Sequence, residues 1–395
     1  MDNTTFRAGL IGSGFAARFH LEAIRRVYGT RVHVVGAHSP NSERLRAFTT
    51  AKQIEPYYSL EEMVETCDVL HICTPPSTHH QLVNYCLQRD RHVIVEKPFT
   101  GYFGDGSPGF NGDNFLKQQG LQMALESIKS MLLTEKSSKG SIHYAENWVY
   151  APAIQKEREI IEKTAAQILW MQGQQAHSGS HSSDYGQWRL AGGGSLMGKG
   201  CHPLTAAIYL KQVEGICRNG LPIRPASVSA RTHAITRMPG FKNLGHLRHT
   251  YTDVEDYATL HIVFDDGTLA DITACELLHG GVKNYLEVHA NNHRTICNMG
   301  PNNAMQSYNP VEENFKDIYV VEKTGTKQGW SFLSPDEAWF NGYQHEMEAF
   351  YHNISTGSPI ESNSQLAAAT IATIYAAYVS AEQKGAGVDV PSVII

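Results

Sequence analysis

A glycine-rich turn near the start of the chain has the spacing of a phosphate-binding loop. Residues 12–17 are Gly-Ser-Gly-Phe-Ala-Ala and lie between an apolar run and a run with helical periodicity. Gly12 would permit the tight turn, Gly14 would let a pyrophosphate approach the backbone, and Ala17 would let the helix pack closely on the strand. The helix N-terminus would then face the phosphates. The residues expected to contact a dinucleotide here are Gly12, Gly14, Phe15 and Ala16.

The end of the next predicted strand bears on which dinucleotide is bound. An acidic residue at this place binds the adenosine ribose hydroxyls of NAD, but the chain has His38-Ser39-Pro40 instead. Ser39 could donate a hydrogen bond to a 2′-phosphate, with help from Arg44, and this would favour NADP. The missing acid does not exclude NAD. We therefore expect NAD or NADP as the cofactor, with Ser39 among its contacts.

Three later segments carry residues suited to a reaction centre. Residues 73–79 (Cys-Thr-Pro-Pro-Ser-Thr-His) and residues 92–98 (His-Val-Ile-Val-Glu-Lys-Pro) each contain a strand end, and residues 192–202 contain three consecutive glycines and end in His202. His202 precedes Pro203 and a predicted helix at 204–210, so we expect it at a helix start, where the helix dipole disfavours protonation and suits a neutral base. Thr74, Pro75, His79, Glu96 and Lys97 are expected to contact the cofactor because the first two segments resemble those of a known dinucleotide-dependent family.

The first part of the chain alternates strands with helices, which predicts a parallel sheet with helical crossovers. A glycine-rich stretch without apolar periodicity, residues 101–114, is expected to be a loop, and Ser59 is expected to cap a helix. The predicted strands are 6–11, 31–36, 68–74, 92–95 and 141–147, and the predicted helices are 15–27, 42–48, 60–65, 78–88 and 115–133.

The second part has runs of strands and few helices, which indicates a mostly antiparallel sheet. Asp265-Asp266-Gly267 is expected to form a hairpin turn. The predicted strands are 168–177, 226–234, 257–264, 269–277, 286–290, 295–299 and 318–323, and the predicted terminal helices are 342–355 and 364–384. The expected fold is thus an α/β Rossmann domain at 1–142 followed by an α+β domain, built on this antiparallel sheet, at 143–395.

Bulk properties fit this two-domain organisation, because 395 residues exceed the usual size of one hydrophobic core. The formal net charge of −6, without a basic block, gives no surface for nucleic acid. No run approaches the ~18 apolar residues that span a membrane. The seven cysteines include no C-x-x-C pair, so a reducing cytoplasmic location is expected.

The glycine turn, residues 73–79 and the Glu96-Lys97-Pro98 triplet together resemble the Gfo/Idh/MocA family, the glucose-fructose oxidoreductase and inositol dehydrogenase group. The resemblance covers essentially the whole chain, with 101–114 as an apparent insertion. It implies hydride transfer between a nicotinamide and a hydroxyl or carbonyl of a sugar, cyclitol or related polyol. It also implies that Lys97 lies near the nicotinamide, aimed by Pro98 through a cis bond, and that the second sheet forms a homodimer or homotetramer.

Residues 192–202 resemble the family's glycine-rich stretch that ends in Asp-x-x-x-His, and His202 matches the catalytic histidine. The predicted catalytic residues are accordingly Lys97, which would stabilise an alkoxide, and His202, which would take the hydroxyl proton. The chain departs from the family at Gly198, where the aspartate is expected, so His202 lacks one charge partner. This departure points to an unusual substrate or reaction.

Histidines and carboxylates are frequent near the expected pocket. His177, His181, Glu276 and His279 could hydrogen-bond sugar hydroxyls or bind a divalent metal, but they form no compact ligand motif, and no metal is predicted. Trp148 would offer a stacking face. The full set of expected substrate contacts is Asn147, Tyr150, His177, His181, Trp188, Arg189, Lys199 and His279.

Two other functions fit the same residues. A glycosidase or lyase could oxidise a sugar carbon transiently, eliminate a substituent and restore the hydride. A catalytically silent, cofactor-binding sensor is the other alternative, but it would not need a positioned base such as His202.

Overall fold

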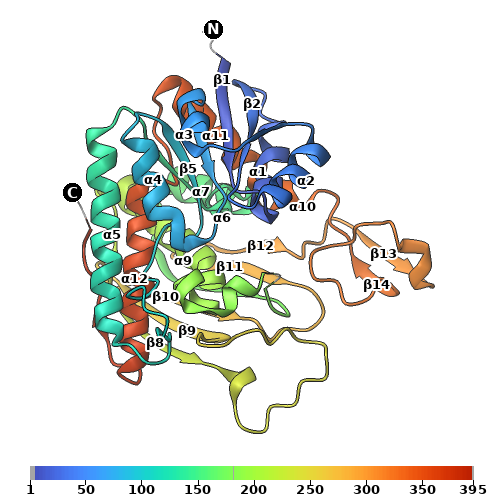
Figure 1. Ribbon diagram of the computed structural model, residues 1–395. Coiled ribbons are helices and arrows are strands. Elements are labelled where there is room, and N and C mark those ends of the chain that lie inside the picture. The colour runs from blue at the N-terminus through green and yellow to red at the C-terminus, as the bar shows by residue number, and fades with distance from the viewer. Residues whose placement is uncertain (1–4, 181, 394–395) are drawn as a thin grey trace.

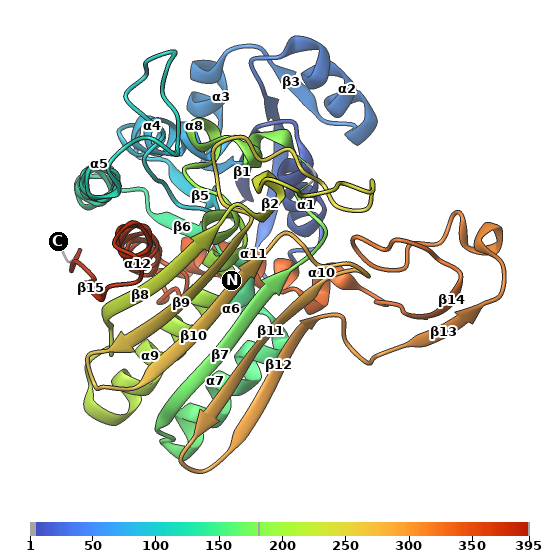
Figure 2. The same cartoon turned by 90° about the horizontal axis from the view of Figure 1, so that it is seen from below.

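The computed structural model describes residues 5–180 and 182–393. Two sheets dominate it, with helices packed around the first and against one face of the second (Figures 1 and 2). No helix in these two ranges is long and apolar enough to cross a membrane.

The first sheet has six parallel strands in the order β3-β2-β1-β4-β5-β6. The alternating pattern predicts the parallel arrangement, but the short strand β3 was not predicted. Its central strands are apolar because both faces of a parallel sheet are covered by helices; all four residues of β4 are buried. The strands are β1 (Thr5–Ile11), β2 (Arg31–His38), β3 (Glu55–Tyr57), β4 (Val69–Ile72), β5 (His92–Glu96) and β6 (Ile142–Ala145). The predicted domain boundary at 142/143 therefore falls inside β6.

Helices connect these strands on both faces of the sheet (Figure 1). Ser59 caps the third helix as expected, because its Oγ accepts a hydrogen bond from Glu62 N at 3.3 Å. Residues 101–114 form the expected loop. The helices are α1 (Phe15–Ile24), α2 (Ser42–Lys52), α3 (Leu60–Thr66), α4 (His79–Leu87) and α5 (Lys117–Ser137).

The second sheet has the order β12-β11-β7-β10-β9-β8-β15, and all its neighbours are antiparallel except β7 and β10. The hairpin at Asp265-Asp266-Gly267 is confirmed, with Gly267 at a φ of 82°. The strands are β7 (Ile168–Ala176), β8 (Pro225–His233), β9 (Tyr257–Phe264), β10 (Leu269–Cys275), β11 (Lys283–Ala290), β12 (Arg294–Gly300) and β15 (Val388–Asp389). Helices cover one face of this sheet, and within residues 5–180 and 182–393 no helix covers the opposite face (Figure 2).

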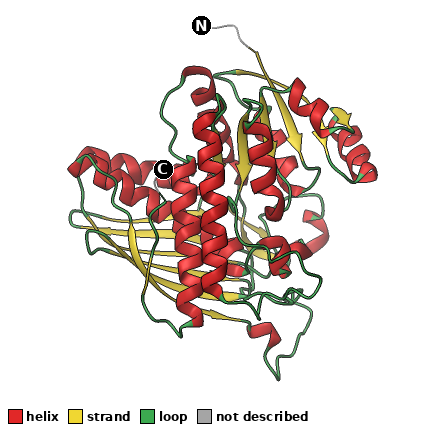
Figure 3. Ribbon diagram, turned by 60° about the vertical axis from the view of Figure 1, so that its left-hand side comes forward, coloured by secondary structure: helices red, strands yellow, loops and turns green. Residues whose placement is uncertain are grey.

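The remaining helices pack between and beside the sheets. The long helix α12 lies alongside α5 and so ties the end of the chain to the Rossmann domain (Figure 3). The helices are α6 (Asn147–Tyr150), α7 (Pro152–Thr164), α8 (Trp188–Ala191), α9 (Cys201–Asn219), α10 (Glu337–Phe340), α11 (Tyr343–Thr356) and α12 (Ser364–Glu382). Helix α7 was not predicted from the sequence, although Pro152 in its first turn is typical of a helix start.

The strand predicted at 318–323 is wrong. These residues belong to the loop of a projecting arm between β13 (Gln306–Asn309) and β14 (Gly329–Phe332), two strands that pair only with each other (Figure 1). Ile318 and Tyr319 are 45% and 63% exposed, so their apolar character does not reflect burial in a sheet.

The outer edge of β6 is covered by a segment from the far end of the chain. Ser362 Oγ donates to Tyr144 O at 2.6 Å, and Tyr144 N donates to Ser362 O at 3.0 Å. His143 and Asn363 form an isolated bridge beside this contact. The strand that leads into the candidate site is thereby held on both sides.

Candidate active site

The glycine turn has the geometry that a dinucleotide needs. Gly12 has a φ of 126°, and a Cβ on it would lie 2.4 Å from Cys73 O, so only glycine fits. A Cβ on Gly14 would have nothing within 4 Å. Gly14 is the N-cap of α1, and no side chain caps that helix. The open space before the helix N-terminus therefore suits a pyrophosphate.

The neighbouring cofactor candidates lie along the same carboxyl edge of the sheet. Ser39 follows β2 and is half-buried, and Thr74 follows β4, with its Oγ1 2.6 Å from Thr78 Oγ1. His79 differs from expectation, because it is fully buried with ring nitrogens 2.9 Å from Pro98 O and 3.0 Å from Thr74 O. Its ring links two loops of the edge, so any effect of His79 on the cofactor is indirect.

Glu96 ends β5 and is held by a chain of buried side chains. Its Oε1 lies 2.9 Å from His20 Nε2, and His20 Nδ1 lies 2.9 Å from His71 Nδ1. Burial alone would raise the pKa of Glu96, but the His20 hydrogen bond and the charge of Lys97 lower it. Glu96 Oε2 accepts from Lys97 N at 3.1 Å, which helps to aim the next residue.

Lys97 extends from β5 towards the second domain. Its Nζ donates to Gly198 O at 3.1 Å, and the Lys97–Pro98 peptide is cis, as the resemblance implies. Burial alone would lower the pKa of Lys97, but nearby acidic groups, among them Glu96 and Glu146, raise it overall. Lys97 is therefore an ammonium at neutral pH.

His202 is paired with a carboxylate that the sequence reading did not identify. Its Nδ1 lies 2.5 Å from Glu146 Oε1, and both side chains are buried. With Nδ1–H donating to the carboxylate, Nε2 keeps its lone pair and can accept a proton. Trp148 lies against the imidazole with ring centroids 5.8 Å apart, so it contacts the histidine as a packing partner.

The position of Glu146 follows from sheet register. Glu96 of β5 pairs with Ala145 of β6, so the residues that follow, Lys97 and Glu146, leave neighbouring strands at the same carboxyl edge. This edge is where parallel sheets bind ligands. The position of Glu146 near the end of the strand predicted at 141–147 could therefore have identified it as a site residue from the sequence.

The expectation about the helix dipole at His202 is corrected. Residues 196–200 already form a π-helical turn that runs directly into α9, so His202 does not stand at a free helix start. The pKa of His202 is lowered by burial first and by the charges of Lys97 and Lys199, against the opposing effect of Glu146. His202 is still expected to be a neutral base, but because of burial and not because of a helix dipole. A π-helical turn is itself frequent at functional sites.

Tyr185 occupies the space beside Gly198, where the family pattern has aspartate. A Cβ on Gly198 would lie 3.4 Å from Tyr185 Cδ1. The Tyr185 ring lies 5.7 Å from Lys97 Nζ and 5.6 Å from Lys199 Nζ. The Tyr185 ring therefore adjoins both ammonium groups at the place where the resemblance leads us to expect a carboxylate.

Lys199 and His177 join a second polar cluster around Glu276. Lys199 Nζ lies 3.0 Å from Ser180 Oγ and 3.3 Å from Glu276 Oε1. Ser180 Oγ donates to the same oxygen at 3.1 Å, and His177 Nδ1 lies 3.4 Å from Glu276 Oε2. Two of the expected substrate residues, Lys199 and His177, are thus brought together beside the Lys97–His202 pair.

The other expected substrate residues bond within the protein or lie at its surface, and their contact with substrate stays a prediction. Asn147 Nδ2 donates to Asn341 O, Tyr150 Oη accepts from Ser362 N, and both residues are buried. Trp188 is a core residue whose Nε1 donates to Tyr102 O. Arg189 and His279 are exposed. His181 lies outside the described residues.

Glu146, Cys201 and His202 offer ligand atoms within 4.8 Å of one another. Zinc at its usual bond lengths would hold two such atoms about 3.3 Å apart in a tetrahedral site, whereas Glu146 Oε1 and His202 Nδ1 are 2.5 Å apart. Burial raises the pKa of the Cys201 thiol to about 12, which keeps it protonated. The geometry fits a hydrogen bond, and the absence of a catalytic metal stays a prediction.

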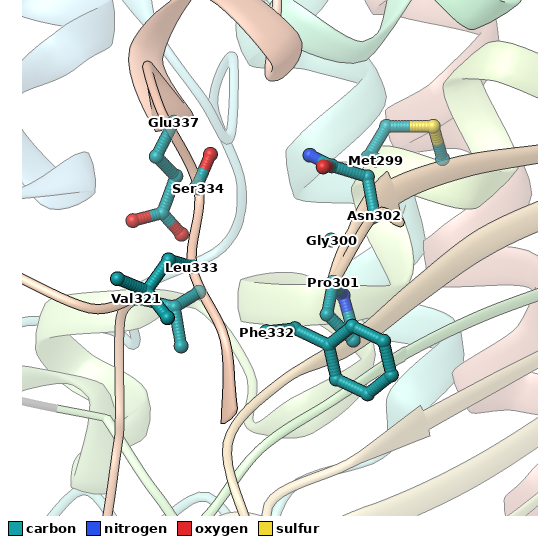
Figure 4. Close-up of a pocket in the computed structure, with 9 residues that line it drawn as sticks. All are labelled: Met299, Gly300, Pro301, Asn302, Val321, Phe332, Leu333, Ser334 and Glu337. Carbon is teal, nitrogen blue, oxygen red and sulfur yellow. The ribbon is translucent and has the colours of Figure 1, made fainter. Parts of the chain in front are cut away.

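A cavity between the end of β12 and the arm is too small for a sugar. Figure 4 shows its lining, with Pro301 on one side and Leu333 and Glu337 on the other. Its volume is about 10 Å³, whereas ligand pockets are usually at least ~300 Å³. A larger groove of about 400 Å³ lies along α5, remote from Lys97 and His202.

Comparison with known proteins identifies both domains of the chain. Residues 6–107 match the oxidoreductase family, NAD-binding Rossmann fold, and residues 154–294 match the GFO/IDH/MocA C-terminal domain. The chain belongs to the Gfo/Idh/MocA family. Its N-terminal domain is the NAD-binding Rossmann fold of that family, and the resemblance drawn from sequence motifs is confirmed.

Curated relatives within the Gfo/Idh/MocA family match only part of the chain. UDP-N-acetylglucosamine 3-dehydrogenase of Acidithiobacillus ferrooxidans is 30% identical over 94 residues, 24% of this chain and 29% of its own length. D-apiose dehydrogenase of Paraburkholderia graminis is 36% identical over 98 residues, 24% of this chain and 26% of its own length. The matched part is thus under a third of either relative.

Solved structures are similar over the whole chain. GenD2 from gentamicin A biosynthesis, solved with NAD, has a TM-score of 0.76 at 20% identity and covers 98% of this chain and 97% of its own. A putative myo-inositol dehydrogenase from Sinorhizobium meliloti 1021 has a TM-score of 0.71 at 16% identity, covering 98% and 100%. These likenesses establish the two-domain fold.

Proposed function

We propose that this protein is an NAD(P)-dependent oxidoreductase that transfers a hydride between a nicotinamide and a hydroxyl or carbonyl of a sugar, cyclitol or related polyol. The observation that carries the proposal is the pairing of His202 with Glu146 beside Lys97, at the carboxyl edge of a cofactor-binding sheet. Curated relatives named as sugar and inositol dehydrogenases support the substrate class.

A bound nicotinamide would supply the hydride acceptor for oxidation. The substrate's C–H bond would give up its electron pair as hydride, and the O–H proton would pass to Nε2 of His202. The Lys97 ammonium would stabilise the negative charge that develops on the oxygen. Glu146 would stabilise the imidazolium that results, because its oxygen already faces Nδ1.

The end of β2 bears on the choice between NAD and NADP. Residues 39–42, directly after His38, include no carboxylate, and Ser39 is half-buried at this edge while Arg44 is exposed on α2. A 2′-phosphate would therefore meet no like charge from these residues, and both NAD and NADP are proposed to bind. Separate titrations of the two dinucleotides, followed by tryptophan fluorescence, measure the preference.

The central test is a screen of sugars and cyclitols for reduction of the added nicotinamide. Turnover that is lost in His202→Asn and Lys97→Met, with the dinucleotide still bound, supports the proposal. Full activity in both variants overturns the site assignment, and failure to bind either dinucleotide overturns the function. A product formed with only catalytic amounts of cofactor would instead identify the redox-assisted glycosidase or lyase.

The second sheet is proposed to form the contact between subunits of a homodimer or homotetramer. Its helix-free face carries exposed Trp170 and Ile296, and Trp170 stacks on His289 with ring centroids 3.9 Å apart. Apolar groups on a face without helices favour a partner there. Light scattering of the wild type and of Ile296→Lys tests the assembly: a monomeric wild type would contradict it.

A further inference from the structure

Three basic side chains from separate segments converge on the loop that follows β7. Lys323 Nζ donates to Gly179 O at 2.7 Å, Arg248 Nη1 donates to Ser180 O at 3.0 Å, and Lys199 Nζ lies 3.0 Å from Ser180 Oγ. They come from the arm, from the connection between β8 and β9, and from the π-helical turn before α9. Because Lys199 is three residues before His202, this positive cluster adjoins the candidate reaction centre.

Two of these cations are nearly inaccessible to solvent. The side chains of Lys323 and Lys199 are 4% and 8% exposed, and lysine is seldom so buried without a partner. The carboxylates that face them are Glu276, 3.3 Å from Lys199, and Glu322, 3.9 Å from Lys323. Three cations and two carboxylates leave one positive charge in excess among these groups.

The excess charge is felt at Lys323. Burial first, and then the charges of Arg248 and Lys199, lower the pKa of Lys323 to about 8. Like charges held together in this way would be relieved by an anion. The lysine ammonium has three donors and the arginine guanidinium has five, and the contacts to Gly179 and Ser180 use one donor from each of Lys323 and Arg248.

Tyr185 connects this cluster with the reaction centre. Its ring centroid lies 5.7 Å from the ammonium group of Lys97 and 5.6 Å from that of Lys199. A sugar ring held against this aromatic face could place a hydroxyl at His202 and a substituent at Lys199.

We propose that the substrate carries an anionic group, a phosphate ester or a carboxylate, which Lys199, Arg248 and Lys323 bind. The inference rests on the proposed function and names its substrate class. Lysine and arginine form short, charge-assisted hydrogen bonds with both anions. If the three cations only braced the loop at residues 177–180, their loss would lower stability without changing the choice of ligand.

The first experiment measures binding without turnover. Protein saturated with dinucleotide, so that the pyrophosphate site is filled, is titrated with inorganic phosphate and with chloride at equal ionic strength while Tm is recorded. Phosphate should raise Tm in the wild type and in Lys316→Gln, and should not in Lys323→Gln. Lys316 is the matched control because it lies in the same loop with a side chain 62% exposed.

Two results would overturn the proposal in this experiment. One is an equal effect of phosphate and chloride on the wild type. The other is a phosphate response in Lys323→Gln that equals that of the wild type. If Lys323→Gln fails to fold, Arg248→Gln takes its place, and the wild-type titration decides the first point in either case.

The second experiment compares a neutral sugar found active in the screen with its phosphate ester and its uronic acid. The preferred anion should raise kcat/KM at least about tenfold over the neutral sugar, or about 1.4 kcal/mol. Lys323→Gln should remove this preference and Lys316→Gln should keep it. The two charged substrates show which anion is bound.

The outcomes separate this inference from the function on which it rests. Turnover of neutral sugars without any preference for a charged one overturns the anion site and leaves the oxidoreductase proposal intact. A phosphate-specific Tm rise in a protein that turns over no sugar supports the anion site and counts against the proposed function.

Discussion

Replacement of Glu146 by Gln tests whether the carboxylate supports proton transfer. A charge-assisted hydrogen bond contributes about 1.5–3 kcal/mol and a neutral one about 1 kcal/mol, so the variant should lose about 0.5–2 kcal/mol of imidazolium stabilisation. The hydrogen bond itself joins His202 Nδ1 to Glu146 Oε1. We therefore expect kcat to fall about 2- to 30-fold.

The same variant should change the pH dependence in a defined direction. Activity needs neutral His202, so kcat/KM rises with pH through the pKa of this residue. Glu146 opposes the burial that lowers this pKa. Without the carboxylate the pKa falls further, and the acid limb of the profile should move to lower pH by about 1 unit, since each unit corresponds to about 1.4 kcal/mol.

Glu157→Gln is the matched control for this measurement. Glu157 is also fully buried and pairs with a histidine, His293, at 2.7 Å, but it lies on α7. Initial rates over pH should show the wild-type acid limb for this control. The reasoning is refuted if Glu146→Gln keeps kcat within twofold of the wild type, or if its acid limb moves to higher pH.

Five further predictions follow from the structure. Lys97→Met should lower kcat about 10²–10³-fold, while the dinucleotide affinity from fluorescence titration changes by less than about threefold. Gly12→Ala should lower the free energy of unfolding by at least about 1–3 kcal/mol, because of its φ of 126° and its contact with Cys73. Gly14→Ala, with open space around it, should keep the apoprotein Tm and weaken dinucleotide binding about tenfold; a lowered Tm would count against this. Burial raises the pKa of Glu255 to about 7, so the folded state binds this proton more tightly than the unfolded state does. The stability that this provides is lost as pH rises from about 4.5 to 7. Between pH 5 and pH 8, the free energy of unfolding measured with denaturant should therefore fall by about 2 kcal/mol less in Glu255→Gln than in the wild type. Treatment with EDTA should leave turnover unchanged, and a loss restored by zinc would contradict the hydrogen-bonded arrangement of Glu146.

Much of the fold could be predicted because its signals are local. Apolar runs bounded by turn residues predicted the parallel strands other than β3, and Ser59 and Asp265-Asp266-Gly267 marked a helix start and a hairpin correctly. The arm was missed because Ile318 and Tyr319 have the composition of a strand but remain exposed. The composition of a segment indicates its preference for a strand conformation, whereas its burial depends on contacts with residues elsewhere in the chain.

The candidate site was predicted less completely because its contacts are long-range. Lys97 and His202 were found from motifs, but the Glu146–His202 hydrogen bond joins residues 56 positions apart. Tyr185 lies beside Gly198 in space, and no local sequence pattern links the two residues. Tyr150 and Trp188 were assigned to the substrate because of their places after the strand that leaves the first domain and before the three glycines, yet both side chains are buried in the core.

The cover on the outer edge of β6 has a consequence for biosynthesis. Glu146 follows an edge strand whose free side pairs with residues 362 and 363. A growing chain that has left the ribosome only as far as the arm would contain Lys97, Glu146 and His202 but would expose this edge. Unpaired edges invite pairing with other chains. Catalytic competence should thus appear only after α12 is synthesised, and nascent or truncated chains that stop at the arm should aggregate.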